Sequence, residues 1–129
     1  MRRRSPRREK TSLWPSSVIA TLGASIAAGK PLPRPKGTTV ADALGPPTIG
    51  DPPFAVLSEL LDEAVTVSEE QLAEGFRFLY ARTKLAGEAA AAAPVAALLS
   101  GAVEPLPGTV LVLSGGNIAP ELAARLLAG

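Results

Sequence analysis

The sequence of 129 residues contains no cysteine and no histidine. Without cysteine the chain can form neither a disulfide nor a thiolate nucleophile, and without either residue type it cannot build a zinc finger. Without histidine it cannot form a Ser-His-Asp triad of its own. A chain free of cysteine is compatible with the cytoplasm, which is the location we expect.

Aromatic residues make up only 4% of the chain, whereas hydrophobic residues make up 47%. The core is therefore expected to consist mainly of Ala, Leu and Val. Such small side chains bury little area, and burial contributes about 25 cal/mol per Å², so the chain is expected to need a partner surface. No apolar run reaches about 18 residues, the length that would indicate a membrane-spanning helix.

Charge is unevenly distributed. Six of the thirteen basic residues and one of the twelve acidic residues lie within 1–10, which leaves a net charge of −4 on 11–129. We expect 1–14 to be a disordered basic arm. The acidic remainder gives no indication of nucleic-acid binding.

Residues 15–29 are small and apolar, and two interpretations apply to them. Pro15 could begin a helix and Gly29 could end it. Alternatively, a cationic start followed by an apolar stretch is the outline of a signal peptide, and the chain would then be a small secreted protein.

The middle of the chain begins with a Pro- and Gly-rich loop over 30–53, in which only Thr38–Leu44 could form a short strand or a helical turn. Apolar spacing predicts a helix over 54–63, and Ala64–Val67 could be a short strand.

The clearest helix signal begins at Ser68, which predicts an N-cap. Gln71 three residues later completes a capping box, and Val67 and Leu72 occupy the hydrophobic-staple positions. We expect this helix to end at Gly87 and to bury one face, formed by Leu72, Phe76, Leu79 and Thr83.

A second helix is expected in the Ala-rich stretch that follows. Proline costs about 3 kcal/mol in a helix interior, so Pro94 predicts that Glu88–Ala90 is loop and that the helix starts after it. Gly101 is expected to end this helix.

The run Thr109–Leu113 is wholly apolar and predicts a strand buried in a parallel sheet. Ser114–Asn117 (SGGN) follows, and Pro120–Ala128 is expected to be a final helix. In open α/β sheets, ligands bind beyond the carboxyl ends of strands. Two glycines would let a ring or an anion approach the backbone, although a pair of glycines often only makes a turn.

Three motifs in series, TVSEEQ, TKLAGE and VLSGGN, resemble the C-terminal part of pyridoxal-phosphate-dependent threonine/serine dehydratases. This family includes threonine ammonia-lyases and serine racemase. SIAAGKP, TVADAL and PPFAVLSELLDEAVTV occur in the same order, so the resemblance runs from about Ala20 to Gly129. It implies that 15–129 is a partial domain of the α/β fold called type II. The part present is mostly helical with one or two short parallel strands.

The resemblance also implies site residues. Ser114 matches the serine that hydrogen-bonds the pyridine nitrogen of pyridoxal 5'-phosphate, and Gly115, Gly116 and Asn117 would line the wall beside the ring. Glu88 matches a glutamate near the cofactor. In a separate segment, Asp42 matches an aspartate near the substrate, a small amino acid that loses water and ammonia to give a 2-oxo acid.

Several features depart from the family pattern. Ala89 and Ala91 replace a proline and a glycine, and Ala43 replaces a glycine, so added methyl groups could crowd the site. The family's Schiff-base lysine and phosphate loop belong to an earlier segment, and the resemblance implies no metal ligands here. We therefore expect no dehydratase activity from this chain alone. An alternative is a non-catalytic module that docks on a full-length relative.

Overall fold

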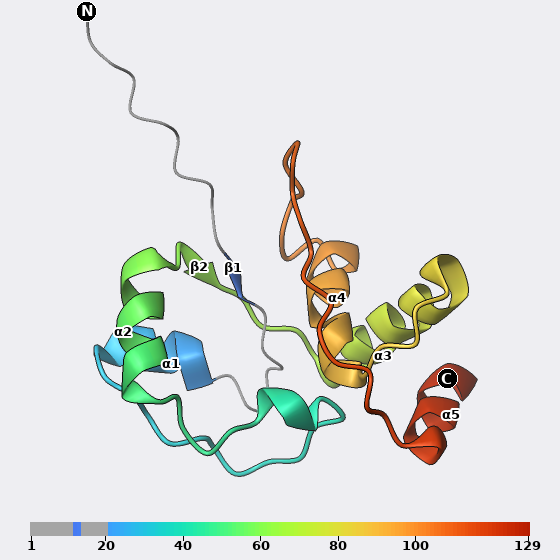
Figure 1. Ribbon diagram of the computed structural model, residues 1–129, viewed down its shortest axis with the longest axis horizontal. Coiled ribbons are helices and arrows are strands. Elements are labelled where there is room, and N and C mark those ends of the chain that lie inside the picture. Colours follow the sequence, from blue (N-terminus) through green and yellow to red (C-terminus); the bar gives the residue numbers. More distant parts are fainter. Residues whose placement is uncertain (1–11, 14–20) are drawn as a thin grey trace, which may run out of the picture.

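The computed structural model describes residues 12–13 and 21–129. Apart from Ser12 and Leu13, the predicted basic arm lies outside the described residues. Strand β1 (Ser12–Leu13) pairs in parallel with β2 (Glu63–Ala64), with Ser12 opposite Glu63. Helices form most of the remaining regular structure (Figure 1), which confirms the predicted class of a mostly helical chain with short parallel strands. A strand was predicted at Ala64–Val67, whereas the observed strand β2 begins one residue earlier and ends at Ala64.

Helix α1 (Thr21–Ala28) ends at Gly29, as predicted. Gly29 has φ +65°, its amide donates to Ile26 O at 3.1 Å, and the Lys30 amide donates to Ser25 O at 3.2 Å. This pair of bonds is a Schellman motif. The predicted beginning of the helix at Pro15 lies outside the described residues.

The Pro-rich loop contains one 3₁₀ turn, η2 (Asp42–Leu44), so the helical turn is the correct alternative for this stretch. An isolated bridge between Pro33 and Thr48 closes the loop around η2. Helix α2 (Asp51–Leu60) begins before the predicted residue 54, because prolines at the first helical positions need no hydrogen-bond partner for their nitrogen.

Helix α3 (Glu69–Phe78) carries the predicted capping box. The Gln71 amide donates to Ser68 Oγ at 3.2 Å, and the Ser68 amide donates to Gln71 Oε1 at 2.7 Å. The helix continues as a π-helical segment, η3 (Leu79–Thr83). The predicted end at Gly87 is wrong, because Lys84 already adopts a left-handed conformation (φ +60°) and stops the helix. On the predicted buried face, Leu72, Phe76 and Leu79 are buried and Thr83 is exposed.

A short turn, η4 (Ala89–Ala92), leads into α4 (Ala93–Leu99). The prediction is therefore nearly correct: only Glu88 of the expected loop stays outside helical structure, and Pro94 lies in the first turn of α4. Helix α4 packs closely on α3 at Gly75, where an added Cβ would lie 2.9 Å from Ala92 O. The resulting core is rich in alanine, as expected, and forms two clusters. Leu126 of α5 (Pro120–Ala128) is buried in the second cluster, and Val40 packs against both.

The strand predicted at Thr109–Leu113 is wrong for the described part of the chain. The segment is extended but forms no strand, and Val110 and Val112 are 80% and 75% exposed. A parallel strand takes its hydrogen bonds from neighbouring strands, and the described residues place none beside this segment. Among the described helices, none is long and apolar enough to cross a membrane.

Candidate functional site

Two segments from distant parts of the sequence meet at Glu88 and Gly115. The Glu88 amide donates to Gly115 O at 3.2 Å. Gly115 has φ +89°, and a Cβ added there would overlap the Glu88 carboxylate. A Cβ added at Gly116 would lie 3.4 Å from Ala86 O, so the two backbones run close together over more than one residue. The structure thus brings together Glu88 and the glycines that the sequence predicted as one site.

Buried residues next to each segment hold this contact in place. Glu88 directly precedes Ala89, which is buried in the cluster formed with Phe76 and Leu126. Ile118 and Leu122, which follow the SGGN turn, pack against the same cluster. One hydrophobic core therefore fixes both sides of the contact between Glu88 and Gly115.

The polar side chains of the SGGN turn are exposed. Neither the Ser114 hydroxyl nor the Asn117 amide has a hydrogen-bond partner among the described residues. All four residues of this segment are exposed, so a flat polar ligand could contact a serine donor, an amide and two glycines there.

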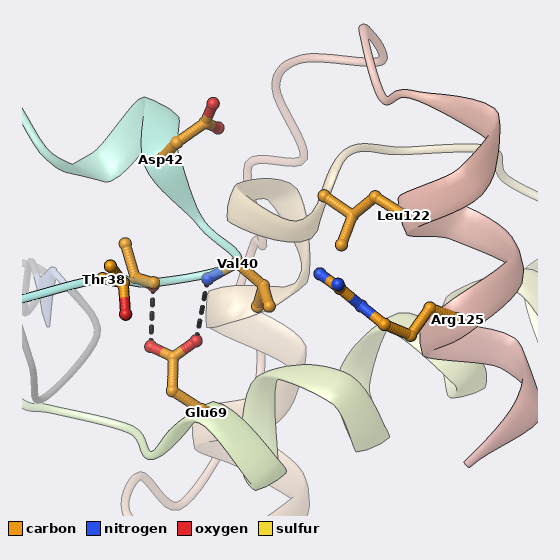
Figure 2. Close-up of a pocket in the computed structure, with 7 residues that line it drawn as sticks. Thr38, Val40, Asp42, Glu69, Leu122 and Arg125 are labelled. Atoms are coloured by element: carbon orange, nitrogen blue, oxygen red, sulfur yellow. Dashed lines mark hydrogen bonds between the residues drawn. The ribbon is translucent and has the colours of Figure 1, made fainter.

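Asp42 lies in a different place, at the start of η2, in an open pocket of about 390 Å³. Its Oδ1 accepts a hydrogen bond from the Ala43 amide at 2.8 Å. The preceding residue, Ala41, is fully buried in one cluster with Ala90, so η2 packs on the turn that follows Glu88. Asp42 is therefore near the same core, but the structure shows no contact between it and Glu88. The pocket is lined by Thr38, Thr39, Val40, Asp42, Glu69, Leu122 and Arg125 (Figure 2).

Sequence analysis did not single out Glu69, which lies in the first turn of α3. Its Oε1 accepts from Thr39 Oγ1 at 2.7 Å, and its Oε2 accepts from the Val40 amide at 2.8 Å. Thr39 Oγ1 in turn accepts from the Ala41 amide at 3.1 Å. These bonds tie the backbone before Asp42 to α3 (Figure 2). No local pattern could have revealed them, because the two partners lie far apart in the sequence.

Glu70, the neighbour of Glu69, is exposed and interacts with groups at the N-terminal end of α3 rather than with the loop before Asp42. Hydrogen bonds from its own backbone amide and from the Ser68 side chain lower the pKa of the Glu70 carboxyl below its ordinary 4.5. Within the described residues, no three carboxylates are grouped closely enough to hold a metal ion.

The family model for pyridoxal-phosphate dependent enzymes matches residues 13–115, which is most of the chain. The chain belongs to this family. The match includes Asp42, Glu88 and Ser114, and it ends at Gly115, inside the SGGN turn.

Relatives and solved structures agree with this membership. The L-threonine ammonia-lyase of Geobacter sulfurreducens is 44% identical over 95 residues, which cover 73% of this chain and 24% of the relative. The L-threonine ammonia-lyase of Thermotoga maritima is 33% identical over 114 residues, which cover 86% of this chain and 27% of the relative. The crystal structure of T.th. threonine deaminase superposes with a TM-score of 0.75 at 33% identity, covering 85% of this chain and 40% of that one. The chain therefore spans about a quarter of the length of its curated relatives.

The residues around Ser114 fit pyridoxal phosphate in two respects. The Ser114 hydroxyl is an unengaged donor among the described residues, suitable for a ring nitrogen. The glycines of the turn have no side chains that would hold a flat ring away from the backbone. At two of the departures from the family pattern, Ala89 and Ala91 are buried, 2% and 4% exposed.

Proposed function

We propose that this chain is the C-terminal part of a pyridoxal-phosphate-dependent threonine/serine dehydratase and supplies one wall of its cofactor site. The observation that carries the proposal is the contact between Glu88 and Gly115, because it unites the two segments that the resemblance assigns to that wall. The similarity to L-threonine ammonia-lyases supports the reaction class. A cytoplasmic location is part of the same proposal.

In this function the Ser114 hydroxyl would donate a hydrogen bond to the ring nitrogen, and Asn117 would border the ring. A hydroxyl is a weak partner for that nitrogen and leaves it without a full positive charge. Bound pyridoxal phosphate supplies the electron withdrawal that favours loss of the α-proton and the β-hydroxyl of the substrate. The hydrogen bond from the Glu88 amide to Gly115 O would hold the backbone next to Ser114 in place.

The proposal includes a partner polypeptide that carries the Schiff-base lysine and the phosphate loop. The segment 109–113 supports this partner, since the apolar side chains of Val110, Val112 and Leu113 are exposed. A run with this composition is typical of a strand buried in a parallel sheet. We assign the upstream part of a dehydratase domain as the partner, with one of its strands beside Thr109–Leu113.

Reconstituted turnover tests the proposal. The chain would be co-expressed with the part of the Geobacter relative that it does not match, and 2-oxo acid release from L-threonine and L-serine would be measured with added cofactor. We expect turnover by the pair and none by either polypeptide alone. Formation of a stable pair that gives no 2-oxo acid would count against the dehydratase function, and so would turnover by the chain alone.

The exposed apolar segment also favours a second function, a non-catalytic module that docks on an intact relative through the same face. This function predicts that the chain co-purifies with a full-length threonine ammonia-lyase. It also predicts that co-expression with the upstream part alone restores no turnover.

A further inference from the structure

The turn that carries Ser114 depends on helix α5 for its position. Before the turn, residues 104–114 form hydrogen bonds only within themselves in the described part of the chain, between Leu106 and Thr109. After the turn, α5 begins within a few residues of Asn117. The hydrogen bond from the Glu88 amide holds one side of the turn, and α5 therefore holds the other.

The packing of α5 on the core is mainly apolar. One face of the helix meets the cluster that contains Phe76, with Leu126 buried and its neighbours Leu122, Ala123 and Leu127 half-buried. Apolar contacts are non-directional. They hold α5 on the core but do not by themselves fix its position along its own axis.

Arg77 supplies a directional contact. Its Nη1 donates to Leu126 O at 3.0 Å, which is the only hydrogen bond that joins α5 to an earlier helix among the described residues. The last carbonyls of a helix have no partner within the helix, and a cation beside them also opposes the negative end of the helix dipole. The backbone at Arg77 is itself well fixed, because Phe76 is buried and Gly75 packs closely against Ala96 of α4.

We propose that Arg77 is a positioning residue of the cofactor site, which acts through α5 on the turn that presents Ser114. The proposal rests on the function given above, in which the Ser114 hydroxyl meets the ring nitrogen. It adds a residue on α3 to which that function assigns no contact with cofactor or substrate. The prediction is that loss of the hydrogen bond to Leu126 O displaces the turn although the turn itself is unchanged.

The first test uses the full chain without cofactor. Arg77→Met keeps a long side chain and a similar helix propensity but removes the donor, whereas Arg77→Lys keeps a charged donor. In Arg77→Met we expect hydrogen exchange at the Leu126 amide to accelerate by about tenfold, because a charged hydrogen bond is lost. The NMR signals of the Gly116 and Asn117 amides should shift as well, and Arg77→Lys should recover most of both effects. Unmoved signals of the turn in Arg77→Met would overturn the proposal.

Two control variants separate positioning from loss of charge and from general loss of stability. Arg82→Met changes an exposed arginine whose side chain has no hydrogen bond or ion pair with a described residue. Ser68→Ala removes the cap at the opposite end of α3 and so weakens the same helix. Neither should shift the Asn117 amide. A shift in Ser68→Ala as large as that in Arg77→Met would show a general loss of stability and would contradict the proposal.

The second test uses the reconstituted pair with pyridoxal phosphate. Arg77→Met is expected to weaken cofactor binding by about tenfold and to move the absorbance band in the same direction as Ser114→Ala, and Arg77→Lys should restore both. Wild-type affinity and absorbance in Arg77→Met would overturn the proposal. If the wild-type pair bound no cofactor, the proposed function would fail instead, and the first test would still decide whether Arg77 positions the turn.

Discussion

Gly115 lies against Glu88 so closely that no side chain fits between them, and its φ of +89° is one that glycine adopts without strain. Gly115→Ala is therefore expected to lower the free energy of unfolding by about 2–3 kcal/mol, mainly from backbone strain and to a smaller extent from displacing the end of the flexible Glu88 side chain. Gly108→Ala is the control, because Gly108 has φ +88° and open space around it. It should lose only about 1–2 kcal/mol. Equal losses in urea unfolding would show that the overlap with Glu88 is absent.

The same contact predicts a rescue by a second substitution. Removing the carboxylate with Glu88→Ala should restore the smaller part of the stability lost in Gly115→Ala, the part due to overlap, and should restore none in Gly108→Ala. A double-mutant cycle measures this coupling, which we expect to be about 0.5–1 kcal/mol. Additive losses would mean that Glu88 and Gly115 do not touch in solution.

Gly75 predicts a packing defect between α3 and α4. Gly75→Ala would place a methyl group 2.9 Å from Ala92 O and 3.0 Å from Ala96 N, so it should cost about 1–3 kcal/mol despite the better helix propensity of alanine. Gly23→Ala, on α1, meets only Ala64 Cβ at 3.7 Å. It should be neutral or stabilising by up to about 1 kcal/mol. Thermal unfolding of both variants tests the contrast, and destabilisation of similar size would contradict it.

Because Ser68 is part of the capping box of α3, Ser68→Ala is expected to lower the free energy of unfolding by about 1 kcal/mol. Ser58→Ala is the control, because the Ser58 hydroxyl bonds only to carbonyls within its own helix, such as Phe54 O at 2.7 Å. Little change in the free energy of unfolding is expected for Ser58→Ala. If the two variants lost equal stability, the cap would not be formed.

Ser68 also predicts a pH effect at Glu70. Because the folded state lowers the pKa of Glu70, this carboxyl stabilises the fold above its ordinary pKa of 4.5, and the contribution disappears as the pH falls through the lowered value. NMR titration should show the pKa of Glu70 rising in Ser68→Ala. An unchanged pKa would rule out the serine hydroxyl as one of its causes.

Glu69 predicts local loosening of the loop that bears Asp42. Glu69→Gln keeps one acceptor oxygen but sets a donor against one of its two partners, the Val40 amide or the Thr39 hydroxyl. Hydrogen exchange at the Val40 amide should therefore accelerate by about tenfold or more. Glu70→Gln changes a neighbouring exposed carboxylate and should leave this amide unaffected. Equal exchange in both variants would remove the positioning role of Glu69.

Local signals in the sequence predicted the helix ends well. The cap at Ser68, the stop at Gly29 and the first-turn position of Pro94 all follow from backbone groups within a few residues. The end of α3 was missed because Lys84, a residue without a strong turn preference, takes the left-handed conformation in place of Gly87.

Two parts of the site depended on distant partners and so were harder to predict. The role of Glu69 depends on a loop thirty residues earlier. The segment Thr109–Leu113 has the composition of a buried strand, yet a strand needs a neighbour that the described residues do not provide. The grouping of Glu88 with the SGGN turn was predicted through the family resemblance, and the structure brings Glu88 and Gly115 into contact.

Cofactor binding by the reconstituted pair tests the central claim most directly. Pyridoxal phosphate would be titrated into pairs that contain the wild-type chain, Ser114→Ala or Ser100→Ala, with bound cofactor followed by its absorbance. The account predicts a shifted absorbance band and weaker binding for Ser114→Ala, and wild-type behaviour for Ser100→Ala, because the Ser100 hydroxyl bonds to Ala97 O at the end of α4. Identical spectra and affinities for all three pairs would contradict the placement of Ser114 at the ring.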